Sequence, residues 1–277
     1  MQLVSVHDRA KLAMWLRANL AMNAFPLCYL DSATWDCTRW LGLDDDGHLR
    51  AVALTYTGAG VTFVNVVGES SARSELLEAA AAADILPHSF LLSIEADVQE
   101  DVSIAGRTLE HVEDFFRMTP PLIERAEASN LVRLTPSDAP RVKALLIEEG
   151  ANPSAFFHAH TLESGLYRGW IENARLVGIV GVHAWSEEQK IAVVGNLAVL
   201  PAMRRNGIAR ALMESIVAEL QSRGWDLAFN VRTDNHAALA LYARMNCRAS
   251  GMVREFRVKV DPAMTSERKI PTIRRPA

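Results

Sequence analysis

The feature that most constrains the fold is a nearly continuous apolar run at residues 191–200, followed directly by a basic loop and an amphipathic helix. Such a run is expected of a strand that is buried on both faces of a sheet. Gly195 and Asn196 interrupt it and predict a β-bulge, where ladder pairing breaks and backbone groups become available to a ligand. The predicted helix has one apolar stripe for packing on the sheet, formed by Ile208, Leu212, Ile216 and Leu220.

The loop between this strand and this helix has the composition of an anion site. A helix start leaves about four backbone N–H groups unpaired and carries partial positive charge. Gly207 lets a ligand approach the backbone, Ala209 keeps the first turn narrow, and three arginines add charge: Arg204, Arg205 and Arg210. The loop therefore predicts phosphate binding, although it is neither a P-loop nor a three-glycine dinucleotide fingerprint. The simpler alternative is a strand-to-helix turn with solvated arginines.

A second strand and a second helix follow. Alternating apolar residues at 225–231 predict a half-buried strand, which a right-handed βαβ connection makes parallel to the first. The next helix places Asn235, Ala238 and Tyr242 on one face, because they stand at positions i, i+3 and i+7. The small residue between the amide and the phenol leaves room for a ligand along that face. A core aromatic with its hydroxyl bonded to backbone is the alternative for Tyr242.

Composition narrows the class of protein. Apolar residues make up 49% and charged residues 22% of the 277 positions, and the net charge of −4 offers no basic footprint for nucleic acid. The three cysteines form no Cys-x-x-Cys pair, so neither a disulfide scaffold nor a cysteine zinc site is expected. The sequence has no signal-peptide pattern and no apolar stretch long enough to span a bilayer. We therefore expect a reduced, cytoplasmic protein that acts on neither nucleic acid nor membrane.

The two halves of the chain repeat one pattern. In the first half we expect a hairpin, a strand, a helix and a strand, at 38–43 with 49–56, then 61–67, 72–83 and 89–95. The second half repeats this order at 166–170 with 175–185, then 191–200, a helix to 223, and 225–231. Even the ends match, since Phe-Phe-Arg-Met at 115–118 parallels Glu-Phe-Arg-Val at 255–258. We predict two α/β units at 1–120 and 130–260, with a mobile tail at 261–277.

In this order and context, the motifs resemble those of the GNAT N-acetyltransferase superfamily. Arg204-x-x-Gly207-x-Ala209 is similar to its pyrophosphate motif, Gln/Arg-x-x-Gly-x-Gly/Ala, and Asn235-x-x-Ala238-x-x-x-Tyr242 to its Asn-x-x-Ala-x-x-x-Tyr motif. The resemblance covers roughly residues 130–260, and the repeat implies that the first half is a degenerate copy. The implied fold is α/β (α+β), with two GNAT-like units. Each unit has a mixed, mostly antiparallel sheet with a central parallel strand pair flanked by helices.

The resemblance implies one acetyl-CoA as cosubstrate, held between two splayed strands, and direct attack of a primary amine on the thioester without a metal. Strand backbone would pair with the pantetheine arm, and amides of the helix start would hold the pyrophosphate. The implied CoA-binding residues are Leu197, Ala198, Val199, Arg204, Arg205, Asn206, Gly207, Ile208, Ala209, Arg210, Asn235, Ala238 and Tyr242. Tyr242, placed near the sulfur, is also the implied catalytic residue.

The chain departs from the family pattern in two places. Met-Asn-Cys at 245–247 stands where Leu-Gly-Phe is usual, which changes the turn beside the acceptor pocket. Many members also carry a glutamate as general base on the strand before the loop, but residues 192–194 are Ala-Val-Val. An amine with a reference pKa near ~10 must lose a proton before attack, so a base or a water chain is needed.

Three upstream histidines could supply that base: His158, His160 and His183. For each of them a surface or hydrogen-bonded structural role is the simpler interpretation. His158 and His160 have no cysteine or carboxylate at ligand spacing, so we expect no metal site.

The first half lacks a counterpart of the phosphate loop. Its equivalent segment, 68–75, contains Glu69 and Glu75 without small residues at the required spacing, and would repel a pyrophosphate. We expect this half to be a scaffold that supplies one wall of the acceptor site. The predicted function is N-acetylation of a small-molecule or peptide amine. The alternatives are a non-catalytic protein that binds CoA as a sensor or scaffold, and an inactive interaction module.

Overall fold

The computed structural model describes residues 1–58, 60, 62–95, 102–124, 129–150, 157 and 159–261, without the side chain of His160. The chain forms two compact units. Unit 1 contains Met1–Asp8, Asp36–Asp114 and the segment from Met252, and unit 2 contains Arg9–Trp35 and Phe115–Gly251. The predicted tail beyond residue 261 and the side chains of His158 and His160 lie outside the described residues.

The two units are not simply the two halves of the sequence, because the last strand of each half joins the sheet of the other unit. In unit 2, residues 115–118 of β6 (Arg107–Thr119) pair antiparallel with β11 (Asp226–Arg232). In unit 1, residues 253–259 of β12 (Arg248–Val260) pair antiparallel with β5 (Ser89–Glu95). The segments with matching sequence, 115–118 and 255–258, are thus both exchanged. The unit boundaries 1–120 and 130–260 were derived from the sequence repeat, and they stay a prediction.

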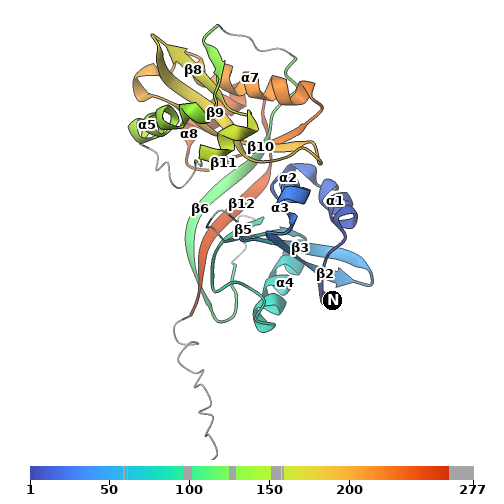
Figure 1. Cartoon of the computed structure of the whole chain (residues 1–277). Coiled ribbons are helices and arrows are strands. Elements are labelled where there is room, and N and C mark those ends of the chain that lie inside the picture. Colours follow the sequence, from blue (N-terminus) through green and yellow to red (C-terminus); the bar gives the residue numbers. More distant parts are fainter. Residues whose placement is uncertain are drawn as a thin grey trace, which may run out of the picture. The chain divides into compact units, whose positions relative to one another are not determined.

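Unit 1 is a sheet with one helix packed on it. Its strand order is β1-β2-β3-β4-β5-β12, and β4 and β5 are its parallel pair. Helix α4 packs on β2, β3 and β4 (Figure 1), and its Leu76, Leu77 and Ala80 are buried. The remaining elements are β1 (Gln2–Ser5), β2 (Thr38–Asp45), β3 (His48–Tyr56), β4 (Phe63–Gly68) and α4 (Ser70–Ala82). These bounds agree with the predicted hairpin, strand, helix and strand to within two residues.

Unit 2 repeats this plan around the order β6-β11-β10-β9-β8-β7, with β10 and β11 as its parallel pair. Helix α7 packs on β8, β9 and β10, as its apolar stripe predicts, and α5 packs on β9 and β10. The remaining elements are β7 (Leu131–Arg133), η1 (Pro136–Asp138), α5 (Ala139–Glu149), η2 (Ala159–Ser164), β8 (Arg168–Glu172), β9 (Arg175–Ser186), β10 (Ile191–Val199), η3 (Pro201–Met203), α7 (Ile208–Ser222) and α8 (His236–Arg244).

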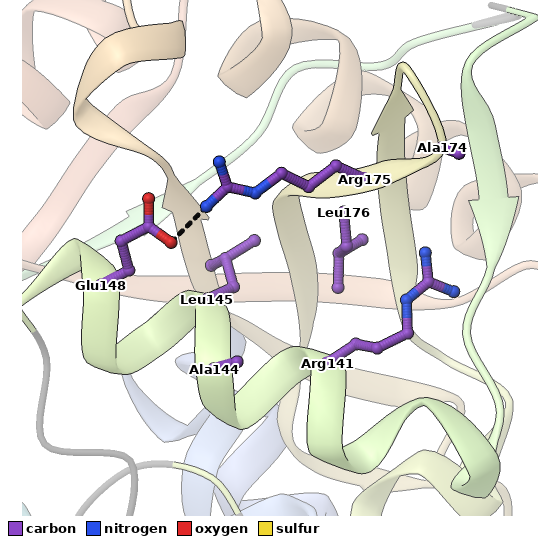
Figure 2. A pocket seen from close by; sticks show the side chains of 7 residues that line it. All are labelled: Arg141, Ala144, Leu145, Glu148, Ala174, Arg175 and Leu176. Atoms are coloured by element: carbon purple, nitrogen blue, oxygen red, sulfur yellow. Dashed lines mark hydrogen bonds and ion pairs between the residues drawn. The ribbon is translucent and has the colours of Figure 1, made fainter.

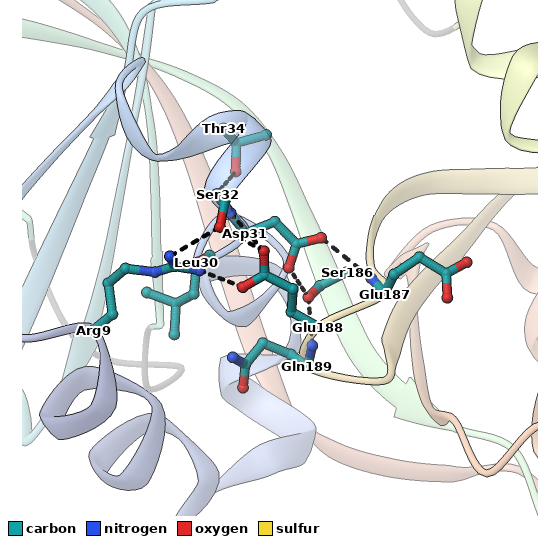
Figure 3. A network of polar contacts seen from close by, with 9 residues as sticks. All are labelled: Arg9, Leu30, Asp31, Ser32, Thr34, Ser186, Glu187, Glu188 and Gln189. Carbon is teal, nitrogen blue, oxygen red and sulfur yellow. Dashed lines mark hydrogen bonds and ion pairs between the residues drawn. The ribbon is translucent and has the colours of Figure 1, made fainter.

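An N-terminal helical segment also belongs to unit 2. It consists of α1 (Arg9–Arg17), α2 (Leu20–Leu27) and α3 (Ser32–Trp35), and α2 packs against β10 and β11. The turn between β9 and β10 anchors it (Figure 3). Glu188 accepts hydrogen bonds from the Ser32 backbone N–H at 2.9 Å and the Ser32 hydroxyl at 2.7 Å, and it pairs with Arg9. The segment is therefore tied to the strands that carry the candidate site.

Candidate functional site

The parallel strands β10 and β11 part in the middle of unit 2. They pair from Ile191↔Asp226 to Val194↔Phe229, yet β10 continues to Val199 and β11 to Arg232. β10 also bulges at this point, because its register with β9 shifts between Gly195 and Ala198. Asn196 has a left-handed φ of 52° in the bulge. The bulge predicted at Gly195 and Asn196 is therefore confirmed.

A second bulge, which the sequence pattern did not reveal, lies opposite on β9. Val193 pairs with Ala184 and Val194 with Val182, so His183 is the extra residue between them. The His183 ring covers Gly195, where a Cβ atom would stand 1.9 Å from its Cδ2 and 2.1 Å from its Nε2. Residue 183 is exposed to solvent, yet the protein around its ring still desolvates the imidazole. This desolvation lowers the pKa of His183 to about 4. The ring is therefore neutral at pH 7.

His183 and Tyr242 lie on opposite faces of the sheet at the point where the strands part. Phe229 is the partner of Val194 in the last pair and shares its face, and the Tyr242 ring lies 4.5 Å from the Phe229 ring. Gly195 follows Val194 and points to the other face, toward His183. A group that passed between the strands would thus meet a phenol on one side and an imidazole on the other.

Tyr242 itself is 6% exposed. Burial, with a smaller contribution from Cys247, raises the pKa of its phenol well above the ordinary value, so the hydroxyl keeps its proton. No hydrogen bond joins this hydroxyl to another side chain or backbone group in the described part of the chain. It can therefore donate to a ligand.

Asn235 caps the N-terminus of α8. It is the N-cap residue, and its Oδ1 accepts a hydrogen bond from the Ala238 N–H at 3.1 Å. This satisfies one of the unpaired donors of the helix start and explains an asparagine here on structural grounds alone. Its exposed Nδ2 donors are the part of the side chain that a ligand could use.

The start of α7 has the backbone of an anion site. Gly207 is the N-cap at a φ of +79°, no side chain caps the helix, and a Cβ on Gly207 would meet nothing within 4 Å. The first bond of the helix runs from the Ala211 N–H to the Gly207 carbonyl at 3.0 Å. The N–H groups of the preceding residues, including Ile208 and Ala209, stand before this first intrahelical bond.

The charge of the loop differs from the expectation of three contributing arginines. Arg204 pairs with Glu149 at 2.7 Å and donates from Nε to the Val199 carbonyl at 3.1 Å, and Arg210 pairs with Glu214 at 2.7 Å. Arg205 is exposed, at a left-handed φ of 68°, with neither an ion pair nor a hydrogen bond to a described residue. Arg205 therefore carries the uncompensated positive charge of this loop.

A pocket of about 250 Å³ lies between α5 and the β8–β9 turn (Figure 2), but none of the predicted site residues lines it, and its Arg175 and Arg141 pair with Glu148 and Asp138. Within the described ranges, no three His, Cys, Asp or Glu side chains come together as metal ligands. No helix there is long and apolar enough to cross a membrane.

The site lies in a segment that matches a known family. Splayed parallel strands followed by an uncapped, glycine-led helix define an acetyltransferase-type fold, and residues 135–246 match the model of the Acetyltransferase (GNAT) family. This part of the chain thus has the GNAT acetyltransferase fold. A segment of 66 residues is 38% identical to an Escherichia coli K12 protein named [Ribosomal protein bS18]-alanine N-acetyltransferase, covering 24% of this chain. The match spans 45% of that relative, about half its length.

Solved structures extend the likeness to the whole chain. A Drosophila protein superposes with a TM-score of 0.62 at 16% identity, covering 94% of this chain and 98% of that one. A GCN5-related N-acetyltransferase from Sphaerobacter thermophilus gives 0.56 at 15%, covering 94% and 96%. A tandem GNAT protein from the clavulanic acid biosynthesis pathway gives 0.53 at 13%, covering 93% and 97%. The predicted tandem GNAT fold is confirmed.

Proposed function

We propose that the protein transfers an acetyl group from acetyl-CoA to a primary amine, with unit 2 as the catalytic unit. The observation that carries the proposal is the parting of β10 and β11 after Val194↔Phe229, on the strand that leads to the uncapped start of α7. The first feature offers unpaired backbone to an extended amide-bearing chain, and the second offers N–H groups and Arg205 to an anion. Acetyl-CoA has both kinds of group, the amides of its pantetheine arm and the anionic pyrophosphate.

In this proposal the pantetheine arm lies along β10. The backbone of Leu197, Ala198 and Val199 pairs with its amides, and the pyrophosphate binds the N–H groups of residues 205–210. Asn206 is held by its own bond from Nδ2 to the Met203 carbonyl at 3.3 Å, so it contributes backbone rather than side chain. Arg204 stabilises the loop through Glu149 instead of contacting phosphate.

The reaction is a direct acyl transfer. The amine nitrogen attacks the thioester carbonyl, a C–N bond forms, the C–S bond breaks, and the sulfur leaves as a thiolate that takes up a proton. Tyr242 is the proposed hydrogen-bond donor to that sulfur, since its raised pKa keeps it protonated, and solvent supplies the proton that the thiolate takes up. The amine attacks as the neutral species, after its ammonium form has lost one proton to solvent, and its nitrogen loses a second proton as the amide forms.

His183 is the proposed acceptor of the amine proton. Residues 192–194 of β10 are apolar and buried, so no carboxylate stands there, and of the three candidate histidines His183 has a described position beside Gly195. With a pKa of about 4 the ring is a weak base. It therefore takes the proton only once the amine has added to the carbonyl and its N–H has become acidic, and passes it to solvent.

The acceptor is tested with a panel of amines. It contains small amines, amino acids, a lysine peptide and a peptide with N-terminal alanine, the last because of the name of the curated relatives. Purified protein is mixed with acetyl-CoA and each amine, and released thiol is measured together with the acetylated product. We expect thiol release that depends on one acceptor class and disappears in Gly207→Glu.

Calorimetry with CoA completes this test. CoA binding without turnover of any acceptor would support the alternative of a CoA sensor or scaffold. A chain that binds neither CoA nor acetyl-CoA would overturn the proposal, and would support an inactive interaction module.

A further inference from the structure

We infer that the Tyr167 hydroxyl is a positioning group that holds both β-bulges of the candidate site, through Asn196 on β10 and the Val182 carbonyl on β9. The inference rests on the proposed function as far as it concerns acetyl-CoA. Tyr167 lies just before β8 in unit 2, and its side chain is fully buried. Neither the motifs nor the family pattern singled it out.

Every hydrogen-bonding position of the Tyr167 hydroxyl is occupied. It donates to the Val182 carbonyl at 3.2 Å, and it accepts from Asn196 Nδ2 at 2.7 Å and from Thr161 Oγ1 at 3.2 Å. A phenol has one donor and two acceptor positions, so no position is left for a substrate. Tyr167 therefore acts through the residues that it holds.

The bond to Asn196 holds a backbone conformation that is costly for most residues. Asn196 is the left-handed residue of the β10 bulge, with a φ of 52°. Asparagine tolerates this region better than most other side chains, but the conformation still carries a cost that a fixed side chain offsets. Because the Asn196 side chain is fixed to a buried phenol, the bulge is fixed where residues 197–199 leave β11.

The bond to Val182 reaches the second bulge. Val182 precedes His183, the extra residue of β9, so the same hydroxyl fixes the backbone next to the ring that covers Gly195. One buried oxygen thus ties together the two irregular positions on either side of Gly195.

The fold makes room for this tyrosine specifically. A Cβ on Gly181 would stand 2.2 Å from Tyr167 Cε1, so the ring can cross β9 only because residue 181 is glycine. Phe157 packs edge-on against the ring at 6.0 Å. The ring, the glycine and the three hydrogen bonds are consistent with a built position rather than a chance contact.

The decisive variant is Tyr167→Phe, compared with Thr161→Val. Each removes hydrogen bonding at the same buried oxygen, but only Tyr167→Phe releases the two bulges. Loss of one neutral hydrogen bond typically shifts an equilibrium by about fivefold to tenfold. Calorimetry should therefore show CoA affinity about fivefold to tenfold weaker in Tyr167→Phe and within about twofold of wild type in Thr161→Val.

A double-mutant cycle isolates the bond to the bulge. Asn196→Gly adopts the left-handed conformation without strain but cannot reach the phenol. In that background, Tyr167→Phe should weaken CoA binding by a smaller factor than in the wild type, because only the bond to the Val182 carbonyl remains to be lost. Equal effects of Tyr167→Phe in both backgrounds would contradict the inference, and Asn196→Gly alone tests the same link if Tyr167→Phe does not fold.

Amide hydrogen exchange without ligand separates this inference from the proposed function. Exchange at residues 182–184 and 195–198 should rise by about fivefold to tenfold in Tyr167→Phe, with wild-type exchange there in Thr161→Val. This result would support the positioning role even in a chain that bound no CoA. Unchanged exchange at both bulges would overturn it, whatever the wild type binds.

Discussion

The two parallel strand pairs of the molecule start alike and end differently. In unit 1, β4 and β5 pair from Phe63↔Leu91 to Val66↔Ile94, as many pairs as β10 and β11 have in unit 2. After the last pair, however, β4 ends at Gly68 and β5 at Glu95, whereas β10 and β11 run on apart. The β3–β4 ladder keeps one register throughout, while the β9–β10 ladder shifts twice. Between these two equivalent ladders, irregularity occurs only in the one from the unit that carries the motifs.

Unit 1 also closes the ends of its strands with its own side chain. Arg73, in the first turns of α4, is 3% exposed. It donates to the Gly68 carbonyl at 2.6 Å and pairs with Glu95 at 3.8 Å, and so links the ends of β4 and β5. The N-cap of α4 is Glu69, which pairs with Arg50 at 2.7 Å. The same scaffold therefore holds a buried cation and a carboxylate in unit 1, but an open, glycine-led helix start in unit 2.

The largest expected effect is that of Gly207→Glu, which gives the α7 start the carboxylate that α4 has. Like charges about 4 Å apart near a protein surface repel by ~4 kcal/mol, so CoA affinity should fall by about 100-fold or more. Gly224→Glu is the matched control, because Gly224 follows α7, has a φ of +75° and has equally open space around its Cβ position. It should bind CoA like wild type.

The stoichiometry of the same proteins tests the comparison directly. Native mass spectrometry at saturating CoA should show one ligand per wild-type chain and none on Gly207→Glu, with circular dichroism unchanged. A second ligand on the wild-type chain would mean that unit 1 binds CoA despite Arg73, and the contrast between the units would fail. A ligand that remained on Gly207→Glu would contradict the assignment of the α7 start as the anion site.

The next effect is that of Tyr242→Phe on turnover. The described residues 102–106, between β5 and β6, contain no helix that would correspond to α8, and the sequence has no tyrosine at 96–106. General acid catalysis is typically worth ~10²–10⁴-fold, and a thiolate with a pKa near ~8.5 already leaves well. We expect kcat to fall by about 100-fold with little change in the dissociation constant for acetyl-CoA. A wild-type kcat in Tyr242→Phe would mean that Tyr242 serves only to pack the core.

A smaller effect is expected on stability when unit 1 loses its closing cation. Arg73→Met should destabilise the chain by about 1–3 kcal/mol, because the Gly68 carbonyl and Glu95 lose a buried donor. Arg50→Met, which removes an exposed ion pair to Glu69, should cost at most ~1 kcal/mol. Urea unfolding measures both, and CoA affinity should not change in either. Similar losses for the two arginines would mean that Arg73 has no special role.

The sequence pattern predicted regular structure well and local irregularity in part. Periodicity located β5, and it located the stripe of α7, whose Ile208, Leu212, Ile216 and Leu220 are all buried. The bulge at Asn196 was predictable because Gly195 and Asn196 interrupt an apolar run. The β9 bulge was not, since His183 stands in a run that reads as one strand. The partner of Arg204 could not be predicted, because Glu149 lies 55 residues away in the sequence. The pair of Arg210 with Glu214 was open to prediction, since the two stand at i and i+4 on one helix.

The smallest expected effect is a pH dependence that comes from the β9 bulge at His183, which has no counterpart in the β3–β4 ladder of unit 1. The pKa of His183 is about 4 in the folded chain, below the ordinary 6.5 that it regains on unfolding. Between these values the unfolded chain binds more protons, so this group makes stability rise with pH. Its contribution is complete above pH 6.5 and is lost as the pH falls toward 4. Urea unfolding at pH 5.0 and 7.5 should show a smaller difference in His183→Gln than in wild type. An equal difference would mean that the ring titrates normally in the fold, and it would weaken the case for His183 as a neutral proton acceptor.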